Sequence, residues 1–193
     1  MERELLLTGI GGQGIQLAAQ VIARAALRDG RAVQMFGSYG GMMRGGRTDA
    51  TIVIADEAVE APPTVGDAWS AIVMHNAYAG PILSAVKAGG VVLVAADVHD
   101  VVLDRDRYTV IEIAASDIAE QVGNRMAASM VMAGAYAAAT DLVSLEALSE
   151  AVAESLPPYR KQLAEVNVAA LRAGFDAAPR AAAPAWDAEP VAR

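Results

Sequence analysis

The sequence contains no cysteine among its 193 residues. This excludes disulfide bonds, and it also excludes iron–sulfur clusters or zinc ions held by thiolates of this chain. Only two histidines are present, His75 and His99, and neither stands at a metal-ligand spacing from the other or from a carboxylate. We therefore expect no metal site, and no cofactor that is bound by this chain alone.

Basic residues are also scarce, since 15 Lys and Arg stand against 23 Asp and Glu, for a net charge of −8. Binding to a phosphate backbone depends on clustered Lys and Arg, so we expect no nucleic-acid partner. The longest weakly charged stretch, residues 126–139, is shorter than the roughly 20 residues that a membrane helix needs. Because the N-terminus shows no signal-peptide pattern either, we expect a cytoplasmic protein without a membrane segment.

Strand-like apolar runs alternate with amphipathic helical patterns in the first part of the chain, and the last third is helical. We expect strands at residues 5–8, 31–37, 50–56, 69–75, 91–97 and 108–114. Helices are expected at residues 15–29, 77–90, 117–123, 125–140, 144–156 and 159–174. This order predicts one α/β domain over residues 1–175, with a mostly parallel sheet flanked by helices. The Ala/Pro-rich residues 176–193 are predicted to form a mobile tail.

A glycine-rich turn separates the first expected strand from the first expected helix. Gly9, Gly11 and Gly14 fit the pattern G-x-G-x-x-G, and Gly12 is an additional glycine. Such a turn favours bound anions through free N–H groups and the helix dipole. A dinucleotide site also needs an acidic residue after the second strand, and "VQMFGSYG" has none. Chain packing and binding of another anion therefore remain open beside NAD binding.

A second glycine-rich segment, Phe36–Ala50, follows the second expected strand. Tyr, Met and Arg are enriched at protein interfaces, so the segment has the composition of a contact surface. Its arginines could instead clamp a phosphate or carboxylate, or balance an acidic surface on a solvated hairpin. The candidate residues for a ligand or a subunit contact are Gly9, Gly11, Gly12, Gln13, Gly14, Ser38, Tyr39, Arg44, Gly45, Gly46 and Arg47.

No set of residues indicates a catalytic centre on this chain. A serine nucleophile would need a histidine base and a G-x-S-x-G elbow, and the sequence has no such combination. His75 ends an expected strand at the edge where ligands bind, and Asn76 is expected to cap the helix that follows. His99 is expected in a solvated loop. Met126, Met130 and Met132 are expected in a tightly packed helix, in the core or against a partner.

Four segments together resemble the gamma subunit of 2-oxoacid:ferredoxin oxidoreductases. They are "GIGGQGIQLAAQVIARAAL", "SYGGMMRGGRTDATIVIAD", "GNRMAASMVMAGA" and "LAEVNVAALRAGF". The paired G-x-G-G-Q-G and R-G-G motifs carry most of the likeness, which covers residues 5–175. Separate gamma chains of 2-oxoglutarate and branched-chain 2-oxoacid enzymes are the most similar members.

The resemblance implies a Rossmann-like domain within a complex that oxidatively decarboxylates a 2-oxoacid to an acyl-CoA. It places thiamine diphosphate, Mg and iron–sulfur clusters on partner subunits, named alpha, beta and a ferredoxin-like delta. The gamma domain is implied to act in assembly and to border the approach of coenzyme A, without a catalytic centre of its own. The resemblance does not indicate which molecule finally accepts the electrons, or how many copies of each subunit the complex contains.

Two positions depart from the family pattern. Gly41 and Met42 stand where relatives often have Pro-Glu, and Ser129 and Met130 stand where they often have Asn-Met. These departures leave the fine contacts and the substrate class open. The alternatives to a gamma subunit are a free-standing NAD(H)-binding oxidoreductase and a regulatory module that binds acyl-CoA.

Overall fold

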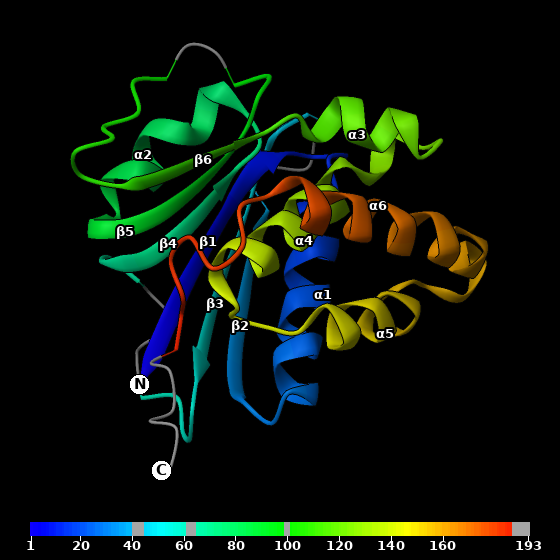
Figure 1. Ribbon diagram of the computed structural model, residues 1–193, viewed down its shortest axis with the longest axis horizontal. Helices are drawn as coiled ribbons and strands as arrows, with labels where there is room; N and C mark the ends of the chain where they lie inside the picture. Colours follow the sequence, from blue (N-terminus) through cyan, green and yellow to red (C-terminus); the bar gives the residue numbers. More distant parts are fainter. Residues whose placement is uncertain (40–44, 61–64, 99–100, 187–193) are drawn as a thin grey trace.

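A computed structural model describes residues 1–39, 45–60, 65–98 and 101–186 of the chain. These residues form a six-stranded sheet with helices on both faces (Figure 1). The strands are β1 (Glu2–Ile10), β2 (Ala32–Tyr39), β3 (Arg47–Ala55), β4 (Ala68–Val73), β5 (Val86–Ala95) and β6 (Thr109–Ile113). The α-helices are α1 (Ile15–Arg28), α2 (Ala79–Ser84), α3 (Ala115–Gln121), α4 (Ala128–Thr140), α5 (Leu145–Ser155) and α6 (Ala164–Ala177). Short 3-10 helices are η1 (Asn76–Tyr78), η2 (Arg125–Ala127) and η3 (Pro158–Leu163).

The sheet is mostly parallel, as predicted, with the strand order β2-β3-β1-β4-β5-β6. β1, β4, β5 and β6 pair in parallel, whereas β3 is antiparallel to both β1 and β2. β1, α1 and β2 form the expected βαβ unit, but β3 lies between its two strands. Every strand except β3 therefore ends at the same edge, which we call the carboxyl edge.

Both faces of the central strands are covered, which explains their continuous apolar sequences. β4 is buried along its whole length, and so is β5 from Gly90 to Ala95. α2 packs on β1, β4 and β5 from one face, and α1 and α4 lie on the other (Figure 1). The apolar runs thus encode a three-layer arrangement in the centre of the domain.

α4 is the central helix of the C-terminal third and is buried on all sides. Its Tyr136 hydroxyl lies 2.7 Å from the Ser70 hydroxyl of β4, and this polar pair is fully enclosed. Burial raises the pKa of Tyr136 above its usual range, so the hydroxyl remains neutral. α4 and α6 approach closely at Gly134 and Gly174, which have no side chains to keep the helices apart. A Cβ on either glycine would overlap the backbone of the other helix.

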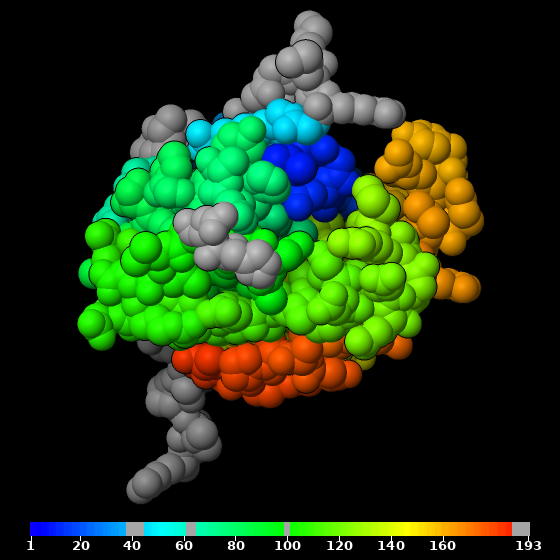
Figure 2. Space-filling view, turned by 90° about the horizontal axis from the view of Figure 1, so that it is seen from above, coloured from blue at the N-terminus to red at the C-terminus, as the bar shows by residue number. Residues whose placement is uncertain are grey.

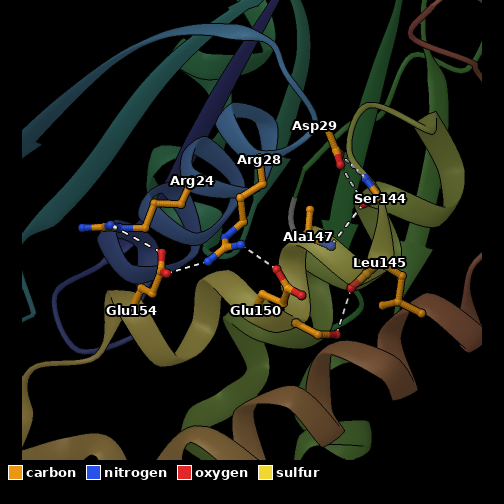
Figure 3. Close-up of polar contacts among 9 residues, drawn as sticks. Arg24, Arg28, Asp29, Ser144, Leu145, Ala147, Glu150 and Glu154 are labelled. Carbon is orange, nitrogen blue, oxygen red and sulfur yellow. Dashed lines mark hydrogen bonds and ion pairs between the residues drawn. The ribbon is translucent and has the colours of Figure 1, made fainter.

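α1 and α5 are joined by a group of polar contacts at the surface (Figure 3). Asp29 accepts hydrogen bonds from the Ser144 backbone N–H (2.7 Å) and hydroxyl (2.8 Å). Arg28 reaches both Glu150 and Glu154 at 2.5 Å. Exposed ion pairs each contribute under about 1 kcal/mol, so these pairs add little to the stability of the domain.

Residues 178–186 form a strap across the end of α4. The backbone N–H groups of alternate strap residues donate to the last carbonyls of α4, in the pairs Ala181–Ala138 (2.8 Å), Ala183–Ala139 (2.9 Å) and Ala185–Thr140 (2.6 Å). Trp186 donates from Nε1 to the Leu142 carbonyl at 3.1 Å, and Arg31 stacks over its ring. Helix ends leave carbonyls without intrahelical partners, and those of a buried helix cannot reach water. The strap provides the missing donors.

The strap lies within residues 176–193, which were expected to form a mobile tail, and the mobility of this segment stays a prediction. The segment has no side-chain periodicity, because it attaches through its backbone rather than through an apolar stripe. Residues 187–193 lie outside the described part of the chain, and there the prediction stays a prediction.

Two expected helices differ in extent from those of the structure. The helix expected over residues 77–90 ends at Ser84, and β5 begins at Val86. Gly89, with φ +77, and Gly90 form an irregularity in β5 instead of ending a helix. The helix expected over residues 117–123 begins at Ala115, so Asp117 lies inside its first turn.

Candidate functional site

The glycine-rich turn between β1 and α1 lies at the carboxyl edge and is held together by Gln13. The Gln13 side chain accepts from the Ile10 N–H through Oε1 (2.8 Å) and donates to the Met74 carbonyl through Nε2 (3.0 Å). A Cβ at Gly9 would stand 2.6 Å from Gln13 Oε1. Gly9 therefore makes room for the side chain that ties the turn to the end of β4.

Two other glycines of the turn allow close approach of the chain to itself. Gly11 donates its N–H to the Gly46 carbonyl at 2.8 Å, across to the start of β3. Gly14 has φ +81, and a Cβ there would stand 2.5 Å from Ser129 Oγ of α4. Gly12, with φ +108, has no described atom within 4 Å of its Cβ position. Packing explains Gly9 and Gly14, whereas a Cβ at Gly11 would make only ordinary van der Waals contacts and Gly12 faces open space.

The second glycine-rich segment connects β2 to β3 at the same edge. The backbones of Ser38 and Tyr39 pair with Asp49 and Thr48, and Gly45 has φ +85. Arg44 lies outside the described residues, as do Gly41 and Met42, so their predicted roles stay predictions. The structure thus brings the two predicted glycine segments together through the Gly11–Gly46 contact.

Arg47 is engaged by neighbours within the chain. Its Nε lies 2.6 Å from Asp49 Oδ2, an ion pair whose angles fall short of a hydrogen bond. Asp49 Oδ1 also accepts from the buried Thr8 hydroxyl at 2.7 Å, and the guanidinium lies 5.9 Å from the centre of the Tyr78 ring. Arg47 is therefore held by Asp49 beside β1 and is less available as a clamp for a free anion.

The position of β3 argues against dinucleotide binding in the usual mode. That mode places the second strand directly beside the first, with an acidic residue at its end. Here β3 occupies that place, and the ideal Cβ of Gly11 would lie 3.4 Å from the Gly45 N–H nitrogen. The chain itself fills the side of the turn where the ribose of a dinucleotide would lie.

A pocket of about 380 Å³ opens on the other side of the turn, toward β4 and β5. Figure 2 looks onto the carboxyl edge, where the N-terminal segment in blue is visible between the cyan, green and lime segments. Ile10, Met74 and Ala95 give the pocket an apolar lining, together with Gly12 and with Met126 of η2. The polar lining is formed by Gln13, Asp97, Ser116 and Arg125.

Asp97, Ser116 and Arg125 were not predicted as site residues. Asp97 follows β5, Ser116 begins α3 and Arg125 begins η2, so they meet only when the strands are placed side by side. Asp97 could have been predicted as a site residue from the sequence, because it follows an apolar strand of a parallel sheet and ligands bind at the carboxyl ends of such strands. Met126 is 66% exposed beside the pocket, whereas Met130 and Met132 are buried in α4.

His75 has a local structural role at this edge. Its Nδ1 accepts from the Ala77 N–H at 3.3 Å and so caps η1, the role that was expected for Asn76. The His75 and Tyr78 rings lie 5.9 Å apart. His99 lies outside the described residues.

Within the described ranges, no three His, Asp or Glu side chains gather in a way that could hold a metal ion. In the same part of the chain, no helix combines the length and apolarity needed to cross a bilayer. The predicted compartment is not tested by this finding.

Gln13→Ala is expected to lower the free energy of unfolding by about 2 kcal/mol, because the Ile10 N–H and the Met74 carbonyl both lose a partner. Urea unfolding followed by circular dichroism measures the change. Gln162→Ala, on η3 away from the turn, serves as the control and should change stability by less than about 0.5 kcal/mol. Equal stability of Gln13→Ala and the wild type would show that the bridge is unimportant.

The fold and the position of the glycine turn define a Rossmann-like α/β domain with a pocket at its carboxyl edge. The family described as pyruvate ferredoxin/flavodoxin oxidoreductase matches residues 4–177, and the chain belongs to this family. Relatives and solved structures of gamma subunits match about nine tenths of the chain.

The 2-oxoglutarate synthase subunit KorC of Methanothermobacter marburgensis is 35% identical, over 90% of this chain and 95% of its own length. The pyruvate synthase subunit PorC of the same organism is 29% identical, over 90% of this chain and 96% of its own. A keto/oxoacid ferredoxin oxidoreductase gamma subunit from Geobacter sulfurreducens has a TM-score of 0.77 at 29% identity, covering 91% of this chain and 98% of that one. These matches confirm the predicted family.

A much longer chain contains the same fold. The 2-oxoglutarate:ferredoxin oxidoreductase from Magnetococcus marinus aligns with 92% of this chain at a TM-score of 0.77 and 19% identity. The alignment covers 31% of that chain. The fold therefore occurs both as a separate chain and as one part of a longer one.

Proposed function

We propose that this chain is the gamma subunit of a complex that oxidatively decarboxylates a 2-oxoacid to an acyl-CoA, and that its work is assembly. The end-to-end match to KorC, over 90% of this chain and 95% of the relative, is the observation that supports this proposal most strongly. Identity to KorC is 35% and to PorC 29%, which favours a 2-oxoglutarate-type substrate.

The chemistry is proposed to lie on other subunits. Without cysteine this chain cannot hold an iron–sulfur cluster through thiolates, so the electron-transfer centres belong to partners. We assign thiamine diphosphate and Mg to alpha and beta subunits, and clusters to these and to a ferredoxin-like delta subunit. The complex is proposed to be cytoplasmic.

The carboxyl edge is proposed as the surface that faces these partners and borders the path of coenzyme A. The β2–β3 connection and the exposed Met126 both lie at this edge. Exposed methionine and tyrosine are typical of protein contacts, because their flexible or flat apolar surfaces adapt to a partner.

Co-expression with the genes that neighbour its own tests this assignment. An affinity tag on this chain is expected to recover larger subunits and 2-oxoacid-dependent, coenzyme A-dependent reduction of a dye. The tagged chain purified alone is expected to show no such activity. Full activity from the single chain, or its recovery as a free monomer from cells that contain the other subunits, would contradict the proposal.

A further inference from the structure

The outer side of β2 is an unpaired edge of the sheet. Among the described strands, β2 lies at one end of the order and pairs only with β3, so no strand lies on its other side. Alternate residues of such a strand direct their N–H and C=O groups away from the sheet. These groups are a template for a further strand, which makes an edge a site where chains associate.

The two edges of the sheet differ in how well they resist such pairing. β6, at the other end, has five residues, and its exposed Glu112 pairs with Arg105 beside it. β2 has eight residues, Ala32–Tyr39, with no charged residue and no proline among them. Short length and charged side chains are the usual protection of an edge strand. The edge at β6 has this protection, and the edge at β2 lacks it.

Phe36 gives the β2 edge an exposed aromatic side chain. A Cβ at Gly37 would stand 2.4 Å from Gln16 Oε1 of α1, so Gly37 faces that helix. Side chains alternate along a strand, so Phe36 lies on the opposite face, away from α1. Phe36 is 38% exposed. It can therefore contact a strand added to this edge without any change in the packing of α1.

The charge of the chain makes the β2 edge suited to contact with a second copy of the same chain. Two copies that each carry a net charge of −8 repel each other wherever their acidic residues meet. The β2 edge lets two copies meet along a strand that carries no charge. Antiparallel pairing of identical strands is symmetric about a two-fold axis, so the contact closes after two copies.

We propose that two copies of this chain associate through antiparallel pairing of their β2 strands, with the two Phe36 side chains directly opposite each other. In this register Gln34 of one copy lies opposite Ser38 of the other. Aromatic side chains that are directly opposite stabilise an antiparallel pair, which favours this register. The contact goes beyond the proposed subunit role, since it joins two copies of one chain and needs no other subunit.

Sedimentation of the purified full chain tests the association. We expect a dimer with a Kd on the order of micromolar, since a single pair of strands is a small interface. Phe36→Lys is expected to weaken the dimer by about tenfold or more, because it places like charges directly opposite each other. Thr109→Lys is the matched control, since it adds the same charge at an exposed position of the β6 edge. It should sediment as the wild type does.

Disulfide trapping tests the register, and the lack of cysteine in this chain restricts it to the introduced thiol. With diamide as the oxidant, Phe36→Cys is expected to form a covalent dimer, because directly opposite Cβ atoms lie about 4.5 to 5.5 Å apart. Gln34→Cys is on the same face of β2, but its two thiols would lie roughly 13 Å apart along the strands. It should form little covalent dimer.

A chain that remains monomeric at about 0.1 mM, well above the expected Kd, would overturn the proposal. Equal disulfide formation by Phe36→Cys and Gln34→Cys would also overturn it, because this result indicates random collision. If the wild-type chain were monomeric and Phe36→Lys prevented co-purification of larger subunits, the edge would pair with another protein and the proposal would be wrong. Co-purification with the wild-type chain tests the subunit role separately, so either proposal can fail alone.

Discussion

Gly134→Ala is expected to lower the free energy of unfolding by about 3 kcal/mol, the upper range for overpacking a core. The new Cβ would overlap the Leu171 carbonyl of α6, which is backbone and cannot rotate away. Gly174→Ala should have a similar effect, because its Cβ would overlap the Val131 carbonyl of α4. Thermal unfolding measures the loss, which corresponds to a midpoint about 10 °C lower for a chain of this size.

Gly80→Ala is the control for this prediction. Gly80 lies in the exposed part of α2, and its Cβ position has no described atom within 4 Å. Alanine has the higher helix propensity by up to about 1 kcal/mol, so this variant should be as stable as the wild type or slightly more stable. Unchanged stability of Gly134→Ala would show that α4 and α6 do not approach as closely as described.

Removal of the strap is expected to cost at least about 3 kcal/mol of unfolding free energy. A chain that ends at Ala177 lacks the donors for three α4 carbonyls, and each unpaired buried group costs about 1 to 3 kcal/mol. It also lacks the Trp186 contact with Leu142 and the hydrogen bond from Arg3 to the Ala185 carbonyl. Urea unfolding with circular dichroism measures the difference.

A chain that ends at Trp186 is the control, because it keeps every described contact of the strap. It should unfold with the midpoint of the full chain. If both truncated chains matched the full chain, the strap would not be part of the stable fold.

The sequence predicted the sheet well where strands are buried, and less well where pairing depends on distant segments. β4 is a continuous apolar run and was recognisable, whereas nothing local to Arg47–Ala55 shows that β3 runs antiparallel between β1 and β2. The strap was missed for a related reason. Its three hydrogen bonds use backbone groups that every alanine carries, so no side-chain pattern marks it.

The candidate site was predicted in part. The glycine turn could be identified, because its glycines are only a few residues apart in the sequence. The hydrogen bond from Gly11 to Gly46 shows that the two glycine-rich segments lie together at the carboxyl edge. The sequence could not show why each of these positions is glycine. At Gly9 a Cβ would collide with the Gln13 side chain, and at Gly14 it would collide with Ser129 of α4. Asp97 follows β5 whereas Arg125 lies between α3 and α4, so only the folded arrangement brings them to one pocket.

Activity of the complex assembled with and without this chain tests the central claim most directly. Partner subunits would be expressed together with this chain or without it, and coenzyme A-dependent oxidation of 2-oxoglutarate would be followed by dye reduction. We predict that the complex without the chain fails to assemble fully and loses most of its activity, which returns when the purified chain is added. A fully assembled and fully active complex without the chain would contradict the assembly role.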